Sequence, residues 1–198
     1  MSRIIGYSLA VLTLVITFTV SNISWKNEAY ANEAVKAKNE IEFLAGKLSS
    51  KDRDVRQEAV VLLGQLQSAE ALPILVKSLK KDPEWLVREK AAYALGLYSN
   101  AASIKALTKA LNEDVVSYVR SASAKSLGKI KSTESVGSLT TLIKARTELD
   151  WRVRLVIVKL LGEIKSDSAI KALEGLVKEE QSPDVKAEAQ KQLELARS

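Results

Sequence analysis

The sequence of 198 residues contains no cysteine and no histidine. The absence of cysteine excludes disulfides, thiolate nucleophiles and thiol redox chemistry. Without either residue, zinc sites of the Cys/His kind and acid–base catalysis by imidazole are excluded as well. A cysteine-free chain folds equally well in an oxidising compartment, so this composition is compatible with export.

Proline and glycine are also scarce, with 3 and 8 residues, too few for the closely spaced turns of an all-β protein. Apolar residues make up 46% of the chain and charged residues 27%, which is typical of a folded domain. Alanine, leucine, lysine, glutamate and valine dominate the later part of the chain. This composition favours helices.

The first thirty residues have a different character from the rest. An uncharged apolar run from Ile4 to Val20 follows Arg3. As a helix it would be about 25 Å long, shorter than the bilayer core of about 30 Å. A polar stretch then ends in Ala29-Tyr30-Ala31, the small-x-small pattern that signal peptidase accepts. We therefore predict a secretory signal peptide over residues 1–31 and a periplasmic or secreted protein.

An uncleaved signal anchor is the alternative, and it would hold the chain on the membrane, facing away from the cytoplasm. No cysteine lies near the apolar run, so a lipoprotein anchor is excluded. Without residues 1–31 the chain keeps 28 basic and 23 acidic side chains, a net charge of +5. The charges are interleaved, which is typical of a soluble surface, and nucleic acid is not an expected partner.

A repeat of 32 to 34 residues runs through the remainder of the chain. A Val-Arg pair, or Val-Lys in the last copy, opens each unit. In the first four units a Leu-Gly pair ends eight residues after the arginine. The basic residues are Arg56, Arg88, Arg120, Arg154 and Lys186, and the glycines are Gly64, Gly96, Gly128 and Gly162. Such a register indicates a repeat architecture.

Apolar residues within each unit follow a helical period. Val87, Ala91, Leu95 and Tyr98 share one helix face. A second helix with its own leucine stripe lies between successive units. The range 33–49 carries a similar stripe, with Ala37, Ile41, Leu44 and Leu48, and is predicted to supply the first partner helix.

These patterns predict an all-α fold over residues 32–198. About five helical hairpins would stack into an α-solenoid that winds as a right-handed superhelix. One hairpin cannot bury its apolar face alone, whereas stacked hairpins form a continuous core. The repeated glycine is expected to permit a close approach between backbones and to weaken the last helical turn.

The pattern Val-Arg-x-x-Ala-x-x-x-Leu-Gly, which Val55 to Gly64 carry in full, resembles the HEAT-like repeats named after phycobilisome lyases. The resemblance covers essentially the whole chain after the signal segment. It implies the solenoid fold, but the same repeat serves scaffolds, adaptors and lyase subunits, so it does not specify a function. The family's bilin lyases act in the cytoplasm, and the export segment disfavours that role here.

The repeated arginines Arg56, Arg88, Arg120 and Arg154 have two interpretations. They could form a cationic ladder that grips a carboxylate or phosphate partner. The favoured interpretation is structural: each arginine ties its helix to an acidic turn, for example through Asp52, Glu84, Asp114 or Asp150.

No catalytic, cofactor-binding or metal-binding pattern emerges. The glutamates and aspartates are not set beside a histidine, a nucleophilic serine elbow or a glycine-rich phosphate loop. The glycines recur once per repeat, which makes them packing residues. We therefore predict a protein that is not an enzyme and has no cofactor.

By resemblance to the family, the helices that begin with the Val-Arg pair line the concave side. Their face away from the core falls two residues before and two, five and nine residues after the basic residue. It also includes Leu97, Ala122, Lys129, Val156 and Glu163. The candidate partner-binding residues are Trp85, Leu86, Lys90, Tyr93, Tyr118, Lys125, Trp151, Arg152 and Lys159.

Aromatic, aliphatic and basic side chains together are typical of protein-binding hot spots. The tryptophans and Tyr118 could instead fill gaps between repeats. The predicted function is an exported, non-enzymatic scaffold or adaptor that holds another protein, or a peptide segment of acidic and apolar character. The alternative is a lyase-like or chaperone-like subunit that assists a protein-modification enzyme.

Overall fold

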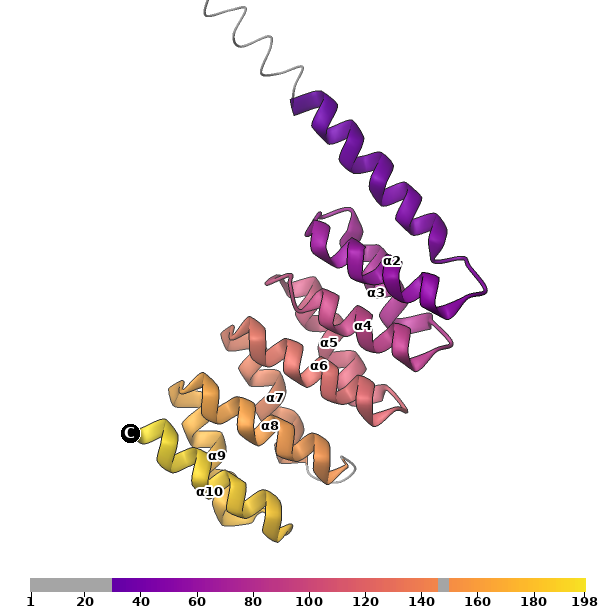
Figure 1. Cartoon of the computed structure of the whole chain (residues 1–198). Helices are drawn as coiled ribbons and strands as arrows, with labels where there is room; N and C mark the ends of the chain where they lie inside the picture. The colour runs from indigo at the N-terminus through magenta and orange to yellow at the C-terminus, as the bar shows by residue number, and fades with distance from the viewer. Residues whose placement is uncertain (1–29, 146–149) are drawn as a thin grey trace, which may run out of the picture. The chain divides into compact units, whose positions relative to one another are not determined.

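The computed structural model describes residues 30–145 and 150–198. The chain divides into two compact units, Met1–Phe43 and Leu44–Ser198. The described part contains a helix over residues 30–47 and nine further helices, with no strand (Figure 1). These nine are α2 (Arg53–Leu66), α3 (Ala71–Lys81), α4 (Trp85–Leu95), α5 (Ala101–Glu113), α6 (Ser117–Ile130), α7 (Thr133–Ala145), α8 (Trp151–Ile164), α9 (Asp167–Glu179) and α10 (Pro183–Arg197).

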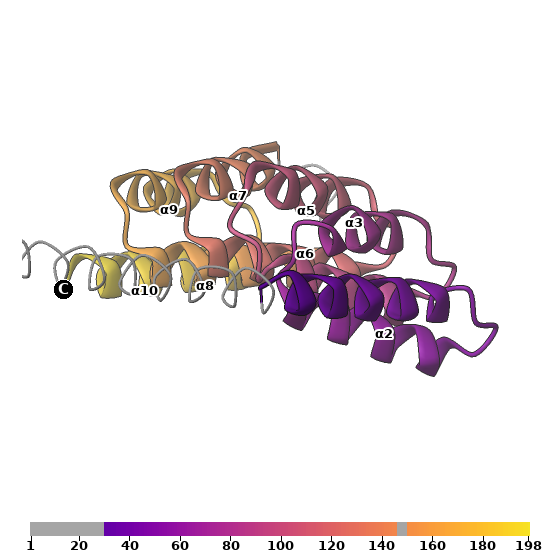
Figure 2. The same cartoon turned by 90° about the horizontal axis from the view of Figure 1, so that it is seen from above.

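The second unit is an all-α solenoid of two layers (Figure 2). One layer, here called the arginine layer, contains α2, α4, α6, α8 and α10, which carry the repeated basic residue. The opposite layer contains α3, α5, α7 and α9. Each helix contacts the next one along the chain and the next one within its own layer. The predicted all-α class and hairpin stack are thereby confirmed.

The core lies between the two layers. Leu63, Leu95, Leu127 and Leu161 of the arginine layer are fully buried, and so are Leu75, Leu107, Leu139 and Leu173 of the opposite layer. These leucines recur with the repeat, which confirms that the helical period read from the sequence marks the buried faces. Stacking gives every internal hairpin a neighbour on each side, so the core is continuous.

The repeated glycines act through close packing, as expected for one of their two predicted roles. A Cβ on Gly64 would lie 2.6 Å from the Cβ of Ala94, and one on Gly96 would lie 2.8 Å from the Cβ of Ser126. Gly64, Gly128 and Gly162 lie in the last turn of their helices, two residues before each helix ends, which is where the other predicted role, weakening the last turn, would act. The residues that cap these helices, Gln67, Lys131 and Lys165, have left-handed backbone angles.

The predicted first helix over 33–49 corresponds to the helix over residues 30–47. Its stripe is only partly buried: Ile41 and Leu44 are buried, whereas Ala37 is exposed. Residues 1–29 of the predicted signal segment lie outside the described residues. Among the described residues, no helix combines the length and apolar character that crossing a bilayer requires.

Tyr98, which follows α4, is buried and donates a hydrogen bond from its hydroxyl to the carbonyl of Leu63 at 3.4 Å. Burial raises the pKa of the Tyr98 phenol above its usual value. The unfolded chain therefore releases this proton at a lower pH than the folded chain. The stability that the neutral phenol contributes is complete below pH of about 10 and is lost as the pH rises beyond it.

We expect Tyr98→Phe to remove this alkaline loss while changing stability at neutral pH by about 1 kcal/mol or less, because one long hydrogen bond disappears. Urea unfolding of both proteins between pH 8 and 11 measures the difference. Tyr118→Phe, at an exposed ring, is the control and should follow the wild-type curve. If the free energy of unfolding falls with pH equally for Tyr98→Phe and the wild type, the expectation is contradicted.

Candidate functional site

Arg56 on α2 joins two successive turns of the solenoid. Its Nε and Nη2 donate to the carboxylate of Asp82 at 2.9 and 3.0 Å. Its Nη1 donates to the carbonyl oxygens of Ser50 and Lys51 at 2.9 and 3.2 Å. The arginine therefore fastens the turn that precedes α2 to the turn that precedes α4.

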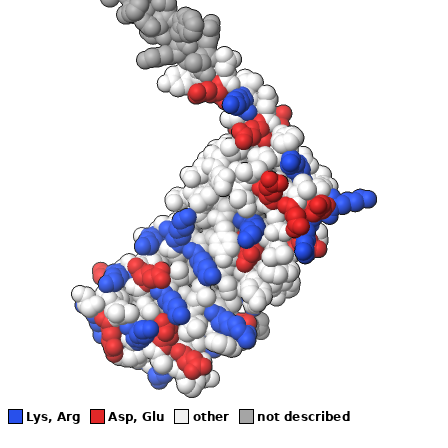
Figure 3. Space-filling view, in the orientation of Figure 1, with Lys and Arg blue, Asp and Glu red and all other residues white. Residues whose placement is uncertain are grey.

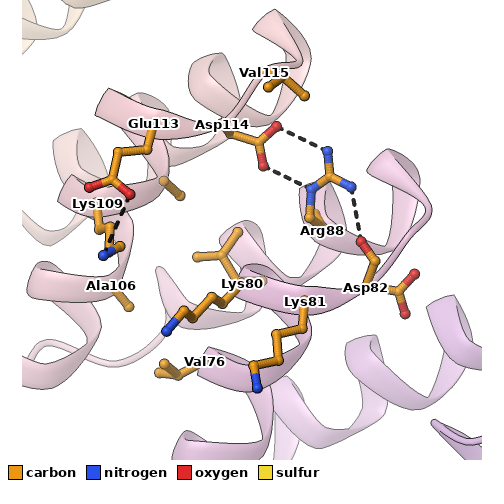
Figure 4. A pocket seen from close by; sticks show the side chains of 12 residues that line it. Val76, Lys80, Lys81, Asp82, Arg88, Ala106, Lys109, Glu113, Asp114 and Val115 are labelled. Atoms are coloured by element: carbon orange, nitrogen blue, oxygen red, sulfur yellow. Dashed lines mark hydrogen bonds and ion pairs between the residues drawn. The ribbon is translucent and has the colours of Figure 1, made fainter.

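Arg88 repeats this arrangement one unit later (Figure 4). Its Nε and Nη2 donate to the carboxylate of Asp114 at 2.8 and 3.0 Å, and its Nη1 donates to the carbonyls of Asp82 and Pro83. The hydrogen bond to the carboxylate raises the pKa of both guanidinium groups, so these arginines stay charged throughout the accessible pH range.

Arg154 and Arg120 show parts of the same pattern. Arg154 lies 3.5 Å from the carboxylate of Glu180, which precedes α10. Arg120 donates to the carbonyl of Asp114 at 2.8 Å. The turn of the next unit that corresponds to Asp82 and Asp114 includes residues 146–149, which lie outside the described residues.

The carboxylates expected to pair with these arginines are the wrong ones for Arg56, Arg88 and Arg154. The guanidinium group of each of these arginines reaches the acidic residue one unit ahead, not the acidic residue of its own turn. Asp52 and Asp150 instead cap their own helices, because they accept from the amides of Asp54 and Arg152. Within their own turns, the guanidinium groups of Arg56 and Arg88 bond to carbonyl oxygens.

The candidate partner-binding residues lie on the arginine layer and differ in exposure. Lys125, Arg152 and Lys159 are exposed, while Trp85, Leu86 and Lys90 are half-buried. Three aromatic side chains are exposed by more than a third: Tyr93 by 39%, Tyr118 by 64% and Trp151 by 45%. Ala122, expected on the same face, is fully buried, because it lies where α6 packs between α4 and α8.

Two aromatic contacts stand at the beginnings of these helices. Trp85 stacks on Tyr118 of the next unit, with ring centroids 5.2 Å apart and an interplanar angle of 27°. Such a pair adds to packing between the units. One unit further on, the guanidinium of Arg152 lies 4.9 Å from the ring centroid of Trp151. Trp85 and Tyr118 thus form a contact between units, and Trp151 with Arg152 leaves an exposed aromatic surface.

A hollow of about 350 Å³ opens on the arginine layer among α2, α4 and α6. The candidates Lys90, Tyr93 and Lys125 line it together. Its remaining lining residues are Val61, Gln65, Ala94, Leu97, Ser126 and Lys129. No acidic residue belongs to this lining, so the hollow combines an apolar floor with three lysines. The remaining candidates are not part of it.

The hollow depends on the sixth residue after each repeated basic residue. This residue packs against the glycine of the preceding unit: Ala94 on Gly64, Ser126 on Gly96, Leu160 on Gly128 and Gln192 on Gly162. The first two are small and the last two are large. Ala94 and Ser126 line the hollow, whereas Leu160 and Gln192 occupy the corresponding places in later units. Sequence reasoning missed this feature, although the size of the residue at that position was its visible signal.

Basic side chains gather over the middle of the face that Figure 1 presents, beside a broad uncharged surface (Figure 3). The arginine layer occupies this face.

The opposite layer carries a different kind of hollow. One of about 510 Å³ lies between α3 and α5, with Lys80, Lys109 and Val115 on its rim and the Arg88–Asp114 pair at one end (Figure 4). Another of about 600 Å³ repeats it one unit earlier, with the Arg56–Asp82 pair at its end. Both hollows border α3 and recur with the repeat, so they are not particular to one unit.

Within the described ranges, no three or more acidic residues cluster in a way that could hold a metal ion.

The family model for HEAT repeats matches residues 41–128 and 117–194. Among solved structures, a chain of the complex of CpcE and CpcF of phycocyanin lyase from Nostoc sp. PCC7120 is similar, with a TM-score of 0.58 and 22% identity. The alignment covers 79% of this chain and 64% of that chain, so the present chain spans less than two thirds of that subunit. At this identity the likeness concerns the fold.

Two further structures are more distant. An engineered protein has a TM-score of 0.49 and 28% identity, with 85% of this chain and 84% of that chain covered. Human deoxyhypusine hydroxylase in complex with glycerol has a TM-score of 0.39 and 16% identity, with 79% and 84% covered. No curated protein matches the sequence.

Proposed function

The chain belongs to the family of HEAT repeats, and from this premise we propose that it is an exported, non-enzymatic scaffold that binds another protein on its arginine layer. The observation that carries the proposal is the exposure of Tyr93, Tyr118 and Trp151 on one layer, next to exposed lysines. Aromatic side chains contribute most to binding when a partner covers them, and a cationic surround steers an acidic partner.

Export rests on the apolar run and the small-x-small pattern of residues 1–31. Expressing the full chain with a C-terminal tag and sequencing the N-terminus of the product in each compartment tests this part. A product that begins at Asn32 outside the cytoplasm is the expected result. An intact Met1 with the repeats in the cytoplasm would contradict export.

Partner binding is tested by placing a photo-crosslinking amino acid at Tyr93 or Tyr118 in the cells that produce the protein. We expect a crosslinked adduct of one defined mass from each position, because both side chains face the bound partner. Lys105, exposed on α5 in the opposite layer, is the control position and should give no such adduct. Equal adducts from all three positions, or none from the arginine layer, would contradict the proposal.

A second candidate function is a subunit that assists a protein-modification enzyme. The likeness to a chain of the CpcE–CpcF complex supports it, because that chain works beside a second subunit. This function predicts a cytoplasmic protein that copurifies with a companion subunit or a bound tetrapyrrole. The N-terminal sequencing above, with an absorbance spectrum of the purified complex, separates the two functions.

A further inference from the structure

We propose that the hollow among α2, α4 and α6 binds an acidic peptide segment of the partner, with one apolar side chain inserted and flanking carboxylates paired to Lys90, Lys125 and Lys129. This inference rests on the proposed scaffold function and specifies the chemistry that the scaffold recognises. Its three parts are the shape of the hollow, its charge and its restriction to one place in the array.

The shape fits one large apolar side chain. The volume of about 350 Å³ is at the lower end of the range of small-ligand sites, enough for a leucine or phenylalanine side chain and part of its backbone. Val61 of α2 and Tyr93 of α4 both line the hollow and are exposed by 38% and 39%. A partner side chain that covers them would remove apolar surface from water, which stabilises the complex.

The charge fits carboxylates. Lys125 and Lys129 lie four residues apart on α6, hence on one face, where like charges repel each other. In the part of the chain that the structure describes, neither ammonium group has an ion-pair partner. Lys90 has only Glu89, at 3.9 Å. Carboxylates of a partner would relieve this repulsion and gain charge-assisted hydrogen bonds.

The arrangement is confined to one part of the array. Leu160 fills the place that Ser126 leaves open, and Glu163 stands where the preceding unit has Lys129. A long polyanion such as nucleic acid or a lipid surface would need a row of cations over several units. Here three lysines surround one hollow, and the next unit has a glutamate in place of the third lysine. A short peptide segment matches this limited cationic surface.

The test is a selection of random nine-residue peptides displayed on phage against the full chain with a C-terminal tag. We expect the selected peptides to share one large apolar residue with at least two Asp or Glu residues within four positions. The best peptide, synthesised with a fluorophore, then provides a dissociation constant by fluorescence polarisation.

Two variants locate the binding site. The charge reversal Lys125→Glu together with Lys129→Glu should raise the dissociation constant of the peptide by tenfold or more. Ser126→Leu should have the same effect, because it fills the hollow as Leu160 does one unit later. Lys105→Glu, on the opposite layer, alters the net charge without touching the hollow and should leave the affinity within twofold. Circular dichroism establishes whether each variant is folded. If Ser126→Leu does not fold, the peptide affinity of the charge-reversal variant alone tests the inference.

Selection of no peptide, a consensus without acidic residues, or unchanged binding by the charge-reversal variant would overturn the inference. Equal binding of polyglutamate without any apolar residue, or of anionic vesicles, would overturn it as well, because the hollow would then play no part. A crosslinked partner at Tyr118 combined with any of these results would leave the scaffold function standing and reject the hollow alone.

Discussion

Asp114→Ala is expected to lower the free energy of unfolding by about 3–5 kcal/mol, because it leaves the guanidinium of Arg88 largely buried and without its carboxylate. The side chains of Arg88 and Asp114 are exposed by only 12% and 9%, and two short hydrogen bonds join them. The same substitution also removes the acceptor for the amide of Val116. Urea unfolding at pH 7 measures the loss.

Glu113→Ala is the matched control, one residue away in the same turn. Glu113 pairs with Lys109 at 3.5 Å on the surface, and both side chains are more than half exposed. Such a pair contributes a few tenths of a kcal/mol. Replacing Arg88 and Asp114 together, by methionine and alanine, should cost less than the sum of the two single changes. Additive losses, or equal losses for Asp114→Ala and Glu113→Ala, would show that the pair does not hold the units together.

Gly64→Ala is expected to be less stable than Gly175→Ala by about 1–3 kcal/mol, although both substitutions replace glycine by alanine inside a helix. The new Cβ at Gly64 would meet the Cβ of Ala94 at 2.6 Å and its Cα at 3.0 Å. At Gly175 in α9 nothing lies within 4 Å, so the variant should gain about 0.5–1 kcal/mol from helix propensity.

Thermal or urea unfolding of the two variants measures this difference directly, because the propensity gain cancels between them. Adding Ala94→Gly to Gly64→Ala should recover part of the lost stability, since it removes the nearer of the two contacts. Equal stabilities of the two single variants would mean that α4 shifts away from α2 without cost.

Much of the fold could be predicted because it follows from local periodicity. The spacing of Val-Arg and Leu-Gly places one apolar stripe on each helix, and a stripe that recurs every 32 residues can be buried only by stacking. Leu63 and Leu95 are buried for this reason. The sequence pattern equally locates the exposed face that carries Tyr93 and Tyr118.

Features that depend on the distance between units could not be predicted in the same way. Asp52 and Asp82 lie in equivalent turns of successive units. Which of the two carboxylates pairs with Arg56 depends on how far its guanidinium group extends toward the next unit. The hollow likewise depends on the volume of Ser126 relative to Leu160, a difference that the hydrophobic pattern does not register. These are properties of packing between helices, where a change of a few methyl groups opens or closes a space.

Because Arg56, Arg88 and Arg154 bond forward to the turn of the next unit, the length of the array can change in whole units. Excising residues 83–114 would bring Asp82 to the position six residues before Arg120 that Asp114 now occupies. The carboxylate of Asp82 would still accept from Arg56. The seam that remained would join α2 and α6 through equivalent repeat positions, with Ser126 against Gly64 where it now lies against Gly96, so duplication or loss of a 32-residue segment keeps the register of the array.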